Sequence, residues 1–251
     1  MFLCASLVVS TLKLLSLRTN NLALHHLPGK RDNFVYICLI ALAPLINLWI
    51  SGYIFSYSSR ARFSHPELFA LHWIFGLSEF VVGSIGILIF INLAINFFRH
   101  RRHLRKTLAL LGVLATLDLF LNIVTLIYGI FHFKIASYFL LLISTGIYIS
   151  LNLIFLFWYW FVDYPTQIRR LHHPEVNSEI LFPGQVLVNS SHWIPKPIDY
   201  LYFTVLTSNT LGPPDNHSPN GARVKFLQLA HSSLMLVLLV IFVSRAVNTL
   251  A

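Results

Sequence analysis

Ionisable and amide side chains occur inside long apolar stretches of the sequence. Asp118, Asn122 and Thr125 are spaced i, i+4 and i+7 and therefore share one face of a helix, while His72 and Glu79 share a face of another. An ionised carboxylate in hydrocarbon requires a partner or a water-filled path. Two interpretations follow: a proton or cation path, or hydrogen bonds between helices that contribute about 1 kcal/mol each. The candidate buried polar residues are His72, Glu79, Asp118, Asn122, Gln228 and His231.

A second group of polar residues surrounds a break in an apolar stretch near the C-terminus. The run from Ile198 to Asn209 is too short to cross ~30 Å of hydrocarbon at ~1.5 Å per residue. We expect a half-helix that enters the membrane and turns back, with its freed backbone groups covered by protein or water. The negative partial charge at its C-terminal end would favour a cation. The residues expected to line a constriction are Thr207, Asn209, Thr210, Leu211, Gly212, Pro213, Pro214 and Asp215.

The order of these elements resembles the pore domain of bacterial potassium channels and of related uncharacterised bacterial integral membrane proteins. Tyr202–Thr207 is similar to the pore helix of that family, and Thr210–Asp215 takes the place of the Thr-Val-Gly-Tyr-Gly-Asp filter. The first glycine and the final aspartate are kept, whereas the tyrosine and the second glycine are not. Two prolines with φ fixed near −65° replace the φ > 0 geometry that a second glycine allows. The resemblance implies a tetramer around a filter that is not of the potassium type.

Composition places the chain in the membrane. Of 251 residues 56% are hydrophobic and 11% are charged, and the mean hydropathy is +0.70. The formal net charge of +9 comes from basic residues placed between apolar runs, which suits bilayer headgroups and argues against nucleic acid as a partner. Cys4 and Cys38 have no spacing typical of a metal site. We expect no metal and no cofactor, and the absence of hydrolase, metalloprotease and phosphate-loop motifs predicts no enzyme.

The apolar runs predict an all-α, polytopic helical bundle with five spans. Residues 1–33 form an N-terminal helix, interfacial or spanning, and a polar loop; residues 34–163 form a four-span bundle; residues 164–197 form a hydrophilic connection; residues 198–251 form the half-helix and the last span. Aromatic residues at the end of the fourth span predict a girdle at the headgroup level. The expected spans are Phe34–Tyr57, Glu67–Phe98, Thr107–Phe131, Ser137–Phe161 and Phe226–Thr249.

Basic residues predict the orientation of the bundle. The densest positive cluster, Arg99–Lys106, places the connection between the second and third spans in the cytoplasm. The fourth span then returns to the cytoplasm, so the half-helix enters from that side, opposite to the potassium channels that it resembles.

Three functions are compatible with these features. The first is an oligomeric channel-like protein for monovalent cations, with the plasma membrane as the expected location. The second is a non-conducting structural or assembly subunit of a membrane complex. The third is a haem or chlorophyll carrier with His72 and His231 as axial ligands.

Overall fold

The chain folds into a bundle of long helices with a small cap at one end. The computed structural model describes residues 30–60, 67–97, 104–132, 137–173, 175–187, 193–210 and 212–250. The expected N-terminal helix within residues 1–29 and the candidate residue Leu211 lie outside this part. The elements in order are α2 Lys30–Arg60, α3 Glu67–Phe97, α4 Leu104–His132, α5 Ser137–His172, β1 Ile180–Leu181, α6 Pro183–Leu187, α7 Pro197–Thr210, β2 Ser218–Pro219 and α8 Ala222–Leu250.

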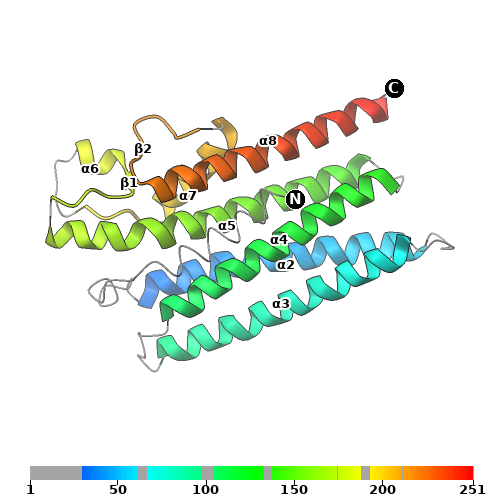
Figure 1. Ribbon diagram of the computed structural model, residues 1–251, viewed down its shortest axis with the longest axis horizontal. Coiled ribbons are helices and arrows are strands. Elements are labelled where there is room, and N and C mark those ends of the chain that lie inside the picture. The colour runs from blue at the N-terminus through cyan, green and yellow to red at the C-terminus, as the bar shows by residue number, and fades with distance from the viewer. Residues whose placement is uncertain are drawn as a thin grey trace.

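Helix α5 occupies the centre of the bundle. It contacts α2 and α4 on one side and α7 and α8 on the other (Figure 1). Residues 151–160 are consequently all buried. The helix also continues to His172 through Pro165, so it includes the first part of the stretch expected to be a connection.

The aromatic residues near the end of α5 form part of the core, and the girdle prediction was wrong for them. Trp158 and Trp160 are 3% and 2% exposed, and Tyr159 is fully buried. The Trp160 ring stacks on Tyr36 of α2 with ring centroids 4.0 Å apart, and the Trp158 Nε1–H group donates to the Thr116 hydroxyl of α4 at 2.9 Å. Because helices surround α5, these rings fill the spaces between helices and do not face headgroups.

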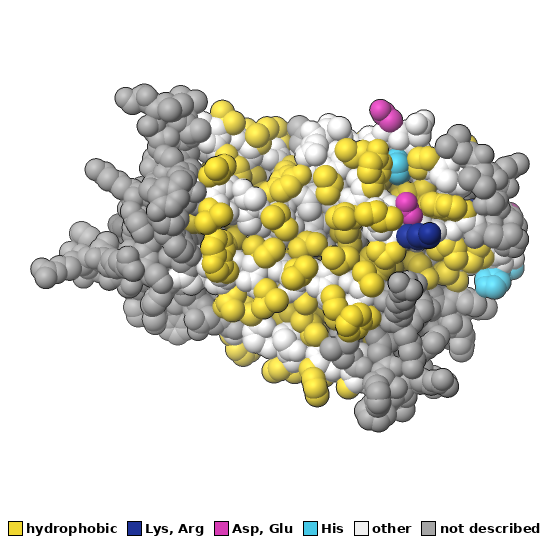
Figure 2. Space-filling model, turned by 180° about the vertical axis from the view of Figure 1, so that it is seen from behind, with side chains coloured by type: hydrophobic (Ala, Val, Ile, Leu, Met, Phe, Trp, Pro, Cys, Tyr) yellow, Lys and Arg dark blue, Asp and Glu magenta, His cyan; other side chains and the backbone are white. Residues whose placement is uncertain are grey.

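Within the described part of the chain, three helices are long and apolar enough to cross a membrane, which is the composition of an integral membrane protein. They are Leu104–Tyr128, Leu141–His172 and Ala222–Val243. In α2 and α3 the apolar stretches found among the described residues are shorter, Phe34–Ile50 and Phe80–Asn92. Figure 2 shows one face of the molecule, on which apolar side chains dominate the described surface and charged groups gather toward one end.

The cap consists of β1, α6 and β2, and it covers the end of the bundle at which α5 ends. Strands β1 and β2 pair antiparallel, with Ile180 opposite Pro219 and Leu181 opposite Ser218. The backbone N–H groups of Asn220 and Gly221 both donate to the Glu179 carbonyl, at 2.9 and 3.2 Å. Helix α4 begins at this same end, since the Arg105 guanidinium lies 5.3 Å from the centre of the Phe161 ring of α5.

Candidate functional site at the half-length helix

Helix α7 has well-defined ends. Pro197 takes the first helical position, where its missing N–H group costs nothing. Asp199 in the first turn accepts a hydrogen bond from the Lys196 N–H group at 2.6 Å and complements the positive end of the helix. At the other end the Thr210 hydroxyl lies 2.7 Å from the Leu206 carbonyl and 3.1 Å from the Gly212 carbonyl. These contacts limit the helix to 14 residues.

The chain after α7 returns to the end of the bundle at which α7 begins. Asn216 adopts a φ of 62°, a left-handed conformation that an asparagine tolerates. The His217 ring then lies 5.8 Å from the ring of Phe203 and 5.4 Å from that of Phe182, so the returning segment runs back along α7. Pairing of β2 with β1 completes the return, and α8 starts beside the cap (Figure 1). The half-helix and its return segment therefore share one end of the bundle.

A buried carboxyl group anchors the start of α7. Asp163 of α5 has no solvent exposure, and the Tyr200 hydroxyl of α7 donates to its Oδ2 atom at 2.7 Å. The Gln167 amide donates to the same oxygen at 2.9 Å, and the Ile180 N–H group donates to Oδ1 at 2.8 Å. Burial raises the pKa of the Tyr200 hydroxyl well above its ordinary value, and the nearby Asp163 carboxyl group raises it further. One side chain thus links α5, α7 and the cap.

Two glutamines extend this anchor into the cap. The Gln185 amide of α6 donates to the Gln167 side-chain oxygen, and the Gln167 amide also donates to the Ile180 carbonyl at 2.9 Å. The Gln185 oxygen accepts from the Phe182 N–H group at 3.2 Å. A buried amide without a hydrogen-bond partner is costly, so these mutual hydrogen bonds hold the cap on α5.

A second polar cluster holds the far end of α7 between α5 and α8. The Asn152 amide nitrogen donates to the Tyr148 carbonyl at 2.9 Å, which leaves its oxygen 2.7 Å from the Ser208 hydroxyl. The Ser208 hydroxyl also lies 3.2 Å from the Thr204 carbonyl and 2.8 Å from the His231 Nε2 atom. The His231 Nδ1 atom lies 3.3 Å from the Tyr159 hydroxyl, so His231 is hydrogen-bonded to both α5 and α7.

The contacts of His231 restrict what its ring can bind. Both ring nitrogens are engaged within the protein, and the Phe155 ring stacks on the imidazole with centroids 4.2 Å apart. Neither nitrogen is left to ligate haem iron or chlorophyll magnesium. In the part of the chain that the structure describes, no group of three or more His, Cys, Asp or Glu is placed to hold a metal ion.

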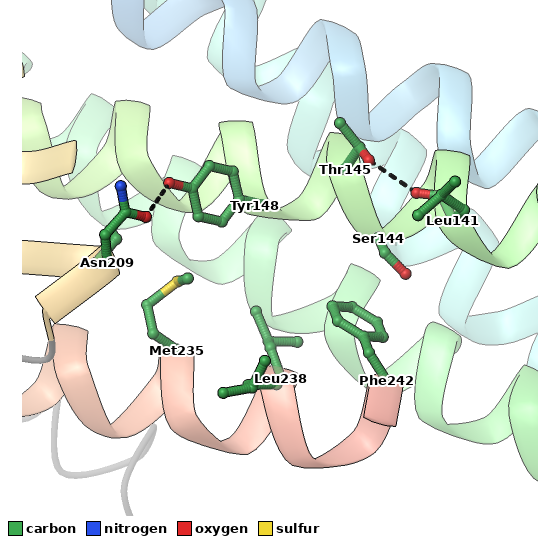
Figure 3. Close-up of a pocket in the computed structure, with 10 residues that line it drawn as sticks. Leu141, Ser144, Thr145, Tyr148, Asn209, Met235, Leu238 and Phe242 are labelled. Carbon is green, nitrogen blue, oxygen red and sulfur yellow. Dashed lines mark hydrogen bonds between the residues drawn. The ribbon is translucent and has the colours of Figure 1, made fainter. Parts of the chain in front are cut away.

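The tip of α7 borders a cavity. The Tyr148 hydroxyl of α5 donates to the Asn209 side-chain oxygen at 2.9 Å (Figure 3). Beyond this pair the cavity extends between α5 and α8 with a volume of about 410 Å³. Its lining is mostly apolar and consists of Leu141, Ser144, Thr145, Tyr148, Ser208, Asn209, Met235, Leu238, Leu239 and Phe242.

The residues predicted to line a constriction have different environments. Thr207 is buried and its hydroxyl donates to the Phe203 carbonyl at 2.8 Å, so it faces the bundle. Pro214 is buried as well, and Gly212 is partly buried. The exposed members are Asn209, Thr210, Pro213 and Asp215.

The candidate buried polar residues fall into separate clusters. Asp118 of α4 accepts from the Asn47 amide of α2 at 2.8 Å and from the Ser78 hydroxyl of α3 at 3.2 Å, and the Asn122 amide donates to the Asp118 carbonyl at 2.9 Å. His231 has its partners on α5 and α7 instead. The side chains of His72 and Glu79 lie outside the described part.

Gln228 of α8 is buried, and its Nε2 atom has no hydrogen-bond partner. The hydrogen bonds of the described residues therefore do not join Asp118 to His231 in one path.

Several residues of the site were not predicted. Asp163 was not recognised as buried, because it was assigned to the end of a span, at the edge of a polar connection. Its partners Gln167 and Tyr200 lie 4 and 37 residues away, and only the i, i+4 spacing of Asp163 and Gln167 is a local signal. Ser208, Asn152 and Tyr159 were also missed, since their partners come from other helices.

Comparisons with protein-family models, with curated proteins and with solved structures found no match for this chain.

Proposed function

We propose that the chain is one subunit of an oligomeric, weakly selective cation-conducting membrane protein, in which the tip of α7 and its return segment surround the axis. The observation that carries this proposal is the half-length helix itself. It ends beside Tyr148 of α5 and His231 of α8, which belong to two long apolar helices, and the chain then turns back. A backbone that turns back at membrane depth must face protein or a polar space.

The exposed groups at the tip suit a cation. Asn209, Thr210 and Asp215 are exposed, and apolar side chains dominate the described surface on the face that Figure 2 shows. The C-terminal end of α7 adds negative partial charge to the Asp215 carboxylate. In a closed ring of subunits these groups would face one another, whereas in a single subunit they face outward.

Weak selectivity follows from the backbone of this segment. A potassium filter strips an ion of water by presenting successive carbonyls. Here two prolines follow Gly212, and none of the described glycines has a positive φ. The segment therefore offers few aligned carbonyls, and a partly hydrated monovalent cation is the expected permeant species.

The topology that accompanies this function is five spans, α2, α3, α4, α5 and α8, in the plasma membrane. Arg105 and the start of α7 lie at the same end of the bundle, and the cluster Arg99–Lys106 is the densest in positive charge. By the positive-inside rule that end is cytoplasmic. The half-helix thus enters from the cytoplasm.

Recording from planar bilayers that contain the purified full-length chain tests the proposal. Asp215→Asn is expected to lower the permeability ratio of cation to anion at low salt, because it removes one carboxylate per subunit. The matched control is Glu175→Gln, which removes an exposed carboxylate from a residue remote from the tip, with 74% of that side chain exposed. Thr210→Ala and Gly212→Ala are expected to change conductance. Silence in several chloride salts, or equal effects of Asp215→Asn and Glu175→Gln, would contradict conduction by this segment.

A non-conducting assembly subunit is the second candidate, favoured by the exposed apolar face of α8. Leu229, Leu239, Val240 and Val243 are each more than half exposed. Such a subunit would bury this face against a different protein. Co-purification of a stoichiometric partner chain, together with silent bilayers, would support this candidate over the channel.

A further inference from the structure

The cavity beyond the tip of α7 exists because this helix is short. Helices α5 and α8 are packed against α7 as far as Ser208 and Asn209. Past that point α5 continues toward Leu141 and α8 toward Phe242, and no described helix fills the space between them. A volume of about 410 Å³ remains. This volume is within the range of about 300–1,000 Å³ that is typical of small-molecule sites.

The walls and the inner end of this cavity differ in chemistry. Leu141, Met235, Leu238 and Phe242 form apolar walls suited to a hydrocarbon chain (Figure 3). The inner end carries Tyr148 and Asn209, which are hydrogen-bonded to each other.

The hydroxyl groups near the inner end already donate hydrogen bonds within the protein. Thr145 donates to the Leu141 carbonyl at 2.9 Å, Tyr148 donates to Asn209, and Ser208 donates within the second polar cluster. The Asn209 amide nitrogen is different, because none of the hydrogen bonds found among the described residues uses it. Its two N–H groups are available to a hydrogen-bond acceptor.

The electrostatics of the cavity disfavour an anionic ligand. No Lys, Arg or His lines the cavity, so an anionic head group would find no counter-charge there. The carbonyl end of α7 carries negative partial charge, which repels an anion further. An uncharged head group with an acceptor oxygen avoids this repulsion and accepts from Asn209.

We propose that this cavity binds an uncharged single-chain amphiphile, such as a long-chain alcohol, with its tail between α5 and α8 and its oxygen at the Asn209 amide. The site does not depend on conduction, so it stands even where the channel proposal fails.

Photolabelling of the purified full-length chain in lipid nanodiscs tests this site. The probe is a long-chain alcohol with a diazirine on its tail, followed by mass spectrometry of the labelled peptides. Labelling is expected at residues 141–148 of α5 and 235–242 of α8, with competition by decanol and none by decanoate. Equal competition by the carboxylate, or label spread evenly over the exposed face of α8, would overturn the proposal.

Three variants separate the cavity from the general lipid surface. Met235→Trp, at a partly buried position of the lining, fills the cavity and is expected to abolish specific labelling, while Leu236→Trp, at an exposed position of α8 that is not part of the lining, leaves it unchanged. Asn209→Asp keeps the acceptor for Tyr148 but replaces the N–H donors, so a methyl ketone such as 2-undecanone, which can only accept a hydrogen bond, is expected to compete about three- to tenfold more weakly.

Unchanged labelling of Met235→Trp, or competition by 2-undecanone that is as strong in Asn209→Asp as in the wild type, would refute the site. Chemical cross-linking that places a second copy of the chain in this space would refute it also.

Discussion

The hydrogen bond between Tyr200 and Asp163 gives the sharpest test of how α7 is held. Tyr200→Phe removes only the hydroxyl, so the ring stays packed 5.3 Å from Phe182 and no cavity forms. The lost bond is 2.7 Å long and ends on a fully buried carboxyl group. A hydrogen bond to a charged group contributes about 1.5–3 kcal/mol. Asp163 keeps its bonds from Gln167 and Ile180, so the loss falls on the attachment of α7 and not on the whole bundle.

Hydrogen exchange of the α7 amides measures this loss directly. A free energy of about 1.5–3 kcal/mol corresponds to exchange on the order of 10- to 150-fold faster across residues 197–210. The matched control is Tyr202→Phe on the same helix, since Tyr202 is 55% exposed and none of the hydrogen bonds found among the described residues uses its hydroxyl. Exchange in Tyr200→Phe that equals the wild type, or that equals Tyr202→Phe, would refute the anchoring role of Asp163.

Two further predictions concern packing and pH. Gly112→Ala is expected to destabilise the chain by about 1–3 kcal/mol in detergent unfolding, because a Cβ atom there would lie 2.5 Å from the Phe157 ring. Gly83→Ala is the neutral control, since a Cβ atom there meets nothing within 4 Å. Equal stability of the two variants would count against close packing of α4 on α5. Burial raises the pKa of Glu179 above its ordinary 4.5, and the opposing attraction of Arg223 is smaller. The protonated form is thus favoured in the folded cap, so the stability contributed by this group is full below pH 4.5 and is lost as pH rises through the folded pKa. Exchange at Asn220 and Gly221, corrected for its intrinsic pH dependence, should accelerate over that range in the wild type and not in Glu179→Gln, and parallel profiles would disprove the linkage.

The helices were largely predictable, whereas their mutual arrangement was not. Apolar runs bounded by polar residues place α3, α4 and α7 within a few residues of their observed ends, because length and composition are local properties. The fourth span was expected to end at Phe161, whereas α5 continues to His172. The helix continues because Asp163 and Gln167 find partners in α7 and the cap.

The candidate site was likewise predictable only in part. The half-helix and its polar tip were expected from the short apolar run and the paired prolines. Which hydroxyl faces the bundle could not be predicted, because it depends on how α7 is rotated against α5 and α8. Thr207 and Ser208 are therefore buried, and Asn209 and Thr210 are exposed.

Labelling of single cysteines from each side of a sealed vesicle tests the central claim, that α7 enters and leaves the membrane on one side. Cys4 and Cys38 are first replaced by serine, and Ile198→Cys, Asn220→Cys and a cysteine in residues 133–136, between α4 and α5, are compared with a membrane-impermeant maleimide. We expect positions 198 and 220 to react from the same side and the third position to react from the other. Reaction of positions 198 and 220 from opposite sides would show that α7 crosses the bilayer and would contradict the account.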